Sequence, residues 1–189
     1  LVRSDLNVPI VRGRVADDFR IRTSLKTIME LRSKGATVIV CSHLGRPEGP
    51  DPELSMNPVA ASIEGLTGIP VIKFDTVVGE DVKRRLDSMA PDSVGLLENT
   101  RFELGEKRND PKLAEAFSSL ADRFVLDAFG SAHRAHASTV GVAERLPSAA
   151  GRLLEAEIAA MEKLLLDPDE AYVVALGGAK ISDKLPVIK

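Results

Sequence analysis

The stretch that decides the fold is Ala36-Thr37-Val38-Ile39-Val40-Cys41-Ser42-His43-Leu44-Gly45-Arg46-Pro47. Its first half is a short apolar run rich in β-branched residues, which predicts a fully buried strand. The strand must end at the polar residues that follow, where Gly45 lets the backbone approach a ligand and Pro47 stiffens the exit. His43 and Arg46 can then meet an anion together. Taken alone, the stretch also fits a surface turn with two solvated side chains.

The same arrangement recurs along the chain, because strands and helices alternate. Apolar runs predict strands at 1–4, 71–74, 94–97, 124–126 and 171–176, and helical spacing of apolar residues predicts helices at 21–31, 55–67, 79–89, 111–120 and 155–166. This alternation predicts an α/β fold, a doubly wound, mainly parallel sheet in a Rossmann-like three-layer sandwich. We expect an N-terminal domain at 1–150, an interdomain helix at 151–168 and the beginning of a second α/β domain at 169–189.

The amino-acid composition excludes several classes of function. The 189 residues carry a net charge of −3, which argues against a nucleic-acid binder, and the absence of Trp argues against base-stacking platforms. The single cysteine, Cys41, forbids a disulfide within the chain and is interpreted as a core residue rather than a nucleophile. The sequence contains no long apolar run, so we expect a cytoplasmic protein without a membrane partner. The chain starts without Met and stops inside an expected helix, which suggests a fragment of a longer protein.

Polar residues gather where the predicted strands end. In an open α/β sheet, ligands bind beyond the carboxyl ends of the strands. The residues expected at that edge are Asp5, Asn7, Arg20, His43, Arg46, Asn99, Arg101, Asp127, His133 and Arg134. Converging arginines suit a small molecule with more than one negative group, such as a phosphorylated carboxylic acid. Pairing of each arginine with Glu98, Glu103 or Asp127 is the alternative.

Two further patterns need an interpretation. His133-x-x-His136, with His43, has a spacing that suits zinc, but neighbouring arginines disfavour a cation, so no metal is expected. Glycines at a strand-to-helix turn favour phosphate, and the second pattern is Gly177-Gly178-Ala179-Lys180 with Lys184 one helical turn later. A plain helix cap with two surface lysines is its alternative. The basic run 83–85 is interpreted as a solvated helix face.

Five segments together resemble the phosphoglycerate kinase family, in the family's order and across essentially the whole chain. They are Val2–Pro9, Ser42–Pro47, Leu96–Phe102, Asp127–Ser138 and Gly177–Lys184. The resemblance implies reversible phosphoryl transfer between 1,3-bisphosphoglycerate and MgADP, giving 3-phosphoglycerate and ATP. It also implies a monomer, and magnesium ligands that lie outside this chain.

Two departures from the family's pattern are small. Leu6 stands where Phe is commonest, and Leu126 stands where Asn is usual. Neither departure removes a charged group, so neither changes the expected site.

The resemblance also implies roles for individual residues. The substrate-binding set is Asp5, Asn7, Arg20, His43, Arg46, Arg101 and Arg134, with His133 close by. Arg20 and Lys180 would act on the phosphoryl group in transfer, from the two sides of the site. The nucleotide set is Gly177, Gly178, Ala179, Lys180 and Lys184. Such a transfer needs positioning and charge neutralisation rather than a nucleophile, and two half-sites imply hinge closure.

We expect the chain alone to bind 3-phosphoglycerate without catalysing transfer. One alternative is a non-catalytic α/β module that binds a phosphorylated metabolite. Another is a nicotinamide-dependent oxidoreductase, which the absence of a dinucleotide-binding glycine pattern disfavours.

Overall fold

The computed structural model of the chain describes residues 1–166. The chain divides into two compact units, Leu1–Glu157 and Ile158–Lys189. The described residues therefore comprise the first unit and the beginning of the second. The predicted strand at 171–176 and the glycine-lysine segment at 177–184 lie outside them.

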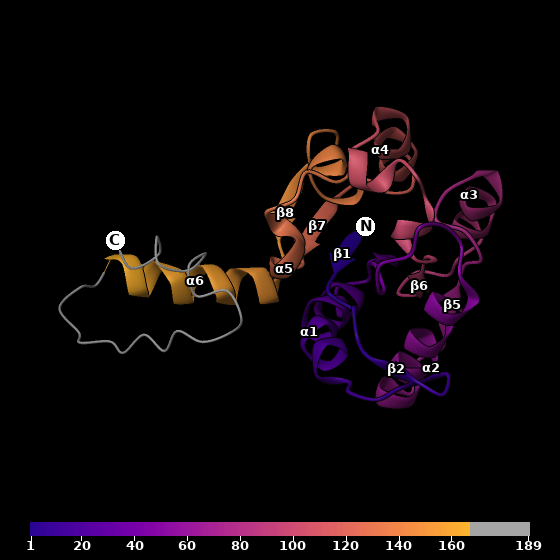
Figure 1. Ribbon diagram of the computed structural model, residues 1–189, viewed down its shortest axis with the longest axis horizontal. Helices are drawn as coiled ribbons and strands as arrows, with labels where there is room; N and C mark the ends of the chain where they lie inside the picture. The colour runs from indigo at the N-terminus through magenta and orange to yellow at the C-terminus, as the bar shows by residue number, and fades with distance from the viewer. Residues whose placement is uncertain (167–189) are drawn as a thin grey trace. The chain divides into compact units, whose positions relative to one another are not determined.

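Within residues 1–166, six parallel strands form one sheet in the order β5-β6-β4-β1-β7-β8. Their bounds are β1 Val2–Ser4, β4 Val38–Cys41, β5 Val71–Lys73, β6 Val94–Leu96, β7 Phe124–Asp127 and β8 Ser148–Ala150. The chain fills one side of β1 with β4, β5 and β6, then crosses to the other side for β7 and β8 (Figure 1). The direction of winding therefore reverses at β1, and such a point is where open α/β sheets hold ligands.

Helices flank both faces of this sheet within the first unit. The helices of the described chain are α1 Phe19–Ser33, α2 Asn57–Thr67, α3 Glu80–Asp87, α4 Pro111–Ser118, α5 Phe129–Ala132 and α6 Arg152–Leu166. Short turns also occur: the 3-10 helices η1 Pro52–Leu54, η2 Thr100–Phe102 and η3 Glu106–Arg108, the π turn η4 Ala137–Gly141, and the hairpin of β2 Ile10–Val11 with β3 Arg14–Val15. The predicted α/β architecture with a parallel sheet is confirmed.

The core has two halves because side chains alternate along each strand. Val38 and Val40 of β4 pack with the apolar faces of α1 and α2. Ile39 and Cys41 point to the other face, where they pack with residues of α3 and α4. This division is the three-layer sandwich that the sequence predicted. Cys41 is fully buried and burial raises the pKa of its thiol to about 12, so it is a core residue.

Sequence signals locate several helix ends correctly. Gly35 follows α1 with a φ of +84°, and Gly68 ends α2 with a φ of +69°. At α4, the Asp110 carboxylate accepts hydrogen bonds from the first turn of the helix, as its position before Pro111 predicts.

Three expectations need correction. The edge strand β8 and the hairpin at 10–15 were not predicted, and α6 begins at Arg152 rather than at 155. The run 83–85 is not wholly solvated, because Arg85 lies 4.6 Å above the Phe74 ring and donates to a backbone carbonyl. None of the helices in the described part of the chain is long and apolar enough to cross a membrane.

Candidate functional site

A pocket of about 300 Å³ lies at the carboxyl ends of the central strands. Its lining comes from the segments that follow β1, β4, β6 and β7, and from the start of α1. The residues that line it are Asp5, Asn7, Arg20, His43, Gly45, Arg46, Arg101, Gly130, Ser131 and Arg134. The fold thus brings together groups that are up to 129 positions apart in the sequence, Asp5 and Arg134 being the extremes.

Most of the predicted site residues line this one pocket. They are Asp5, Asn7, Arg20, His43, Arg46, Arg101 and Arg134. Gly45, Gly130 and Ser131 line it as well, although sequence reasoning did not name them as ligands. His133, Asn99 and Asp127 do not line it.

The pocket is strongly cationic. Four arginines face one carboxylate, that of Asp5, and this carboxylate is 2.5 Å from Nη1 of Arg20. The Arg20 side chain is half exposed, so the ion pair orients it at the rim of the pocket rather than burying it. The other three arginines have no carboxylate among the pocket's lining residues. Such a set favours an anion with several negative oxygens.

The loop after β4 is held by polar side chains from the segments that follow two other strands, β1 and β6. The backbone N–H of Gly45 donates to Oδ1 of Asn7 at 2.9 Å, and the carbonyl of Gly45 accepts from Arg101. The Arg101 side chain is buried and its Nε has no hydrogen-bond partner. Burial, and then repulsion from Arg134 and Arg3, lowers the pKa of Arg101. The loop is therefore fixed by hydrogen bonds within the chain itself.

His43 lies at the inner wall, 8% exposed, and its Nδ1 is 2.8 Å from Nη2 of Arg3. Burial lowers the pKa of His43 to about 2, and the charges of Arg3, Arg101 and Arg134 add to the effect. His43 is therefore neutral at physiological pH. Arg3 was missed as a site residue because it stands inside a predicted strand. Its one sequence signal is a charged residue in a strand that should be buried.

The alternative in which acidic neighbours neutralise the arginines does not hold for Glu98 and Asp127. Glu98 binds Lys73 at 2.7 Å instead. Asp127 is fully buried, and its Oδ1 accepts from the backbone N–H groups of Leu153 and Leu154. Asp127 thus caps α6 and is not a ligand candidate.

Asn99 is also a structural residue. Its side-chain amide bonds the backbone of Leu44 in both directions, donating at 2.8 Å and accepting at 3.1 Å. It also accepts from the backbone N–H of Arg101. Asn99 therefore joins the loops after β4 and β6 without facing the pocket.

The histidines of the His-x-x-His pattern do not share a site. His133 is exposed and accepts a hydrogen bond from Nε of Arg134 at 3.2 Å. His136 is buried, with Nδ1 3.8 Å from Glu106, and burial lowers the pKa of His136 to about 4. No group of three His, Cys, Asp or Glu side chains within the described residues could hold a metal ion.

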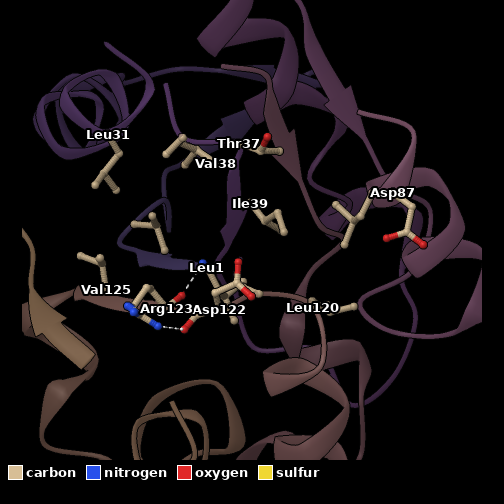
Figure 2. Close-up of a pocket in the computed structure, with 14 residues that line it drawn as sticks. Leu1, Leu31, Thr37, Val38, Ile39, Asp87, Leu120, Asp122, Arg123 and Val125 are labelled. Carbon is tan, nitrogen blue, oxygen red and sulfur yellow. Dashed lines mark hydrogen bonds between the residues drawn. The ribbon is translucent and has the colours of Figure 1, made fainter. Parts of the chain in front are cut away.

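A second pocket, of about 490 Å³, lies at the opposite, amino-terminal edge of the sheet (Figure 2). Apolar side chains such as Leu31, Val38 and Leu120 line much of it. The charged residues in its lining, Asp87, Asp122 and Arg123, carry both signs and no surplus of positive charge, so the site at the carboxyl edge is the better candidate for anion chemistry.

Comparisons with known proteins agree with the resemblance seen in the sequence. The phosphoglycerate kinase family profile matches residues 1–189. Phosphoglycerate kinases of Rubrobacter xylanophilus and Thermus thermophilus are 54% and 49% identical, each over 100% of this chain and 48% of the relative. The chain therefore spans about half the length of the curated relatives it matches.

Solved structures give the same picture. Phosphoglycerate kinase from Coxiella burnetii superposes with a TM-score of 0.83 at 38% identity, over 97% of this chain and 46% of that one. The enzyme from Pyrococcus horikoshii superposes with a TM-score of 0.87 at 31% identity, over 99% of this chain and 48% of that one.

Proposed function

The chain belongs to the phosphoglycerate kinase family, and we propose that its cationic pocket is the 3-phosphoglycerate half of that enzyme's active site. The whole protein would transfer a phosphoryl group reversibly between 1,3-bisphosphoglycerate and ADP, giving 3-phosphoglycerate and ATP. The observation that carries the proposal is the meeting of four arginines around one pocket of about 300 Å³. A pocket of that size is at the small end of ligand sites and suits a three-carbon phosphate.

The proposed roles follow from where each side chain lies. Arg46, Arg101 and Arg134 lack a carboxylate partner in the pocket and would bind the phosphate and carboxylate oxygens of the ligand. Arg20, oriented by Asp5, lies at the rim and would steady the phosphoryl group as it is transferred. Asn7 accepts a hydrogen bond from the Gly45 loop and would bond the ligand as well. Transfer by positioning and charge neutralisation requires no nucleophile from the lining residues.

The nucleotide belongs to the other half of the proposed site. Gly177, Gly178, Ala179, Lys180 and Lys184 would begin it, and they lie outside the described residues. Magnesium would accompany ADP or ATP there, with ligands outside this chain, as the family resemblance implies. We infer that the chain alone binds 3-phosphoglycerate without catalysing transfer, as a monomer and in the cytoplasm, where glycolytic substrates occur.

Calorimetry with the 189-residue chain tests the proposal. We expect heat on titration with 3-phosphoglycerate and an affinity that falls steeply with salt. Arg46→Ala removes a charge-assisted contact of about 1.5–3 kcal/mol, which weakens binding by about tenfold to a hundredfold. Arg84→Ala is the matched control, because Arg84 is exposed on α3 and pairs with Asp81 away from the pocket.

Three outcomes would contradict the proposal or the inferred incompleteness of the chain. A folded chain that shows no heat with 3-phosphoglycerate does not carry this half-site. Equal losses of affinity in Arg46→Ala and Arg84→Ala would point to general charge attraction instead of a built site. Turnover of 3-phosphoglycerate with MgATP by the chain alone would refute its incompleteness.

A further inference from the structure

A buried chain of hydrogen bonds, called the polar strut below, links Arg3, Ser138 and Glu106 and contacts His43 of the pocket lining. Arg3 of β1 is 1% exposed, and its Nε donates to Oγ of Ser138 at 3.0 Å. Ser138 in turn donates from Oγ to Glu106 at 2.5 Å, and its backbone N–H donates to the other carboxylate oxygen at 3.0 Å. Glu106 is fully buried. The positive charge of Arg3 therefore lies at one end of the strut and the Glu106 carboxylate at the other. The hydrogen bonds between them fix the plane of the Arg3 guanidinium.

The free end of this strut meets His43. Nη2 of Arg3 is 2.8 Å from Nδ1 of His43. A guanidinium only donates and stays protonated at any physiological pH, so Nδ1 must accept and cannot carry a proton. A neutral imidazole then carries its proton on Nε2. Since Arg3 occupies Nδ1, Nε2 is the ring nitrogen left for the pocket that His43 lines.

We propose that Arg3 is a positioning residue, which fixes His43 as the neutral tautomer with its proton on Nε2 and so makes it a hydrogen-bond donor to the bound anion. The identity of that anion as 3-phosphoglycerate rests on the proposed function. A neutral donor adds a hydrogen bond to the ligand without adding another positive charge to a pocket that already holds four arginines. The same contact sets the ring's orientation, because the strut holds Arg3 rigidly.

The charges around His43 keep this state through the physiological pH range. Arg3, Arg101, Arg134 and His136 all act on the ring, and each disfavours a second proton. The pocket's other charged groups are Arg20, Arg46 and Asp5, and Asp5 is engaged by Arg20. Burial acts in the same direction as the cations. His43 therefore donates from Nε2 at both pH 6 and pH 8.

The test is ¹⁵N NMR of the imidazoles in the 189-residue chain, which has three histidines and allows assignment by His133→Gln and His136→Gln. In the wild type we expect a protonated Nε2 and a bare Nδ1 for His43 between pH 6 and 8. Arg3→Met combined with Glu106→Gln removes both charges of the strut together, so the variant carries no uncompensated buried charge. We expect both tautomers in this variant, an upward shift of His43 titration, and about three- to tenfold weaker 3-phosphoglycerate binding.

Two further variants separate the role of Arg3 from a structural role. Glu106→Gln alone keeps the contact between Arg3 and His43, so the tautomer should stay as in the wild type. Arg3→Lys keeps a positive charge but loses the planar fork, so mixed tautomers should appear although the charge is preserved. If the double variant fails to fold, the Arg3→Lys spectra decide the question.

The proposal is overturned if wild-type His43 carries its proton on Nδ1 or is doubly protonated at pH 7. It is also overturned if folded Arg3→Lys and the double variant both keep the wild-type tautomer and affinity. A wild type that shows the Nε2 tautomer but no heat with 3-phosphoglycerate refutes the proposed function instead. Tautomer and ligand identity are thus tested by separate measurements.

Discussion

The junction between β7 and α6 offers a sharp test of how the site's edge of the sheet is held. Asp127, the last residue of β7, is fully buried, and its Oδ1 accepts from the backbone N–H groups of Leu153 at 2.8 Å and Leu154 at 3.2 Å. Gly151 precedes them, and a Cβ there would lie 2.3 Å from the Asp127 carboxylate. One side chain thus caps the start of α6 from inside the sheet.

The magnitude of Asp127→Ala follows from these contacts. Loss of a helix cap costs about 1 kcal/mol, and N–H groups that water cannot reach cost a further 1–3 kcal/mol when left unpaired. The other carboxylate oxygen, Oδ2, is buried without a partner, and its removal offsets part of that loss. We expect a net loss of about 2 kcal/mol of unfolding free energy. Asp127→Asn keeps an acceptor and loses only the charge at the helix N-terminus, which costs about 0.5–1 kcal/mol.

Urea unfolding followed by circular dichroism measures the effect. With an m-value of about 2 kcal/mol/M, Asp127→Ala should lower the midpoint by about 1 M, and Asp127→Asn by less than half as much. Asp122→Ala is the control, since Asp122 is exposed just before the other end of β7 and should change the free energy by no more than about 0.5 kcal/mol. An Asp127→Ala midpoint equal to that of the control would refute the capping argument. An Asn variant as unstable as the Ala variant would show that charge matters and the acceptor does not.

Other predictions address the pocket loop, a buried ion pair and acid stability. Gly45 has a φ of +63°, and a Cβ there would lie 2.8 Å from Leu54. Gly45→Ala should therefore lower the free energy of unfolding, measured by urea titration, by about 1–3 kcal/mol and weaken 3-phosphoglycerate binding. An unchanged unfolding free energy and affinity would contradict this expectation. Lys73→Met removes the cation that lies 2.7 Å from the buried Glu98 carboxylate. We expect the free energy of unfolding to fall by about 3 kcal/mol in the same urea titration. A fall of less than about 1 kcal/mol would refute the importance of this ion pair. A hydrogen bond from an arginine on α6, and then one from a lysine, lowers the pKa of Glu30 from 4.5 to about 2, so its contribution is present above pH 4.5 and is lost as the pH falls toward 2. Glu30→Gln should therefore flatten the pH dependence of stability in that window, and an unchanged slope would count against the shift.

The fold was predictable where the sequence carries strong periodic signals. The apolar runs of β4 and β6 and the cap at Asp110 each specify structure locally, and the structure follows them. The strand β8, Ser148–Ala150, carries no such signal, since its three small residues are exposed. It forms because it pairs with β7 at the sheet edge, with Phe124 opposite Ser148. That pairing depends on a neighbour about 24 residues earlier, which no local pattern reveals.

The site was predictable to the level of which strand ends meet, because the carboxyl ends of parallel strands share one edge. Sequence position does not say where a side chain points at that edge. Asp127 and Asn99 stand beside true lining residues, yet both turn toward backbone groups and serve as braces. Conversely, Arg3 and Glu106 could not be predicted as site residues, because their role depends on the hydrogen bonds that link them through Ser138, which is distant in the sequence.

A pocket with so many arginines raises the question of what keeps it open before a ligand binds. Part of the answer is that two of the four arginines, Arg101 and Arg134, are restrained by groups other than carboxylates, whereas Arg20 pairs with Asp5. Arg101 donates to the Gly45 carbonyl and Arg134 donates to Nε2 of His133, and neither partner is a carboxylate. A backbone carbonyl or an imidazole nitrogen fixes the position of a guanidinium without cancelling its positive charge. A carboxylate in the same place would neutralise that charge. Burial, and then the positive charges of Arg134 and Arg3, lower the pKa of Arg101, which shows that its charge lies in a strongly cationic environment. In the proposed site, a bound anion would relieve the repulsion among these arginines, so the arrangement would favour a multiply charged metabolite.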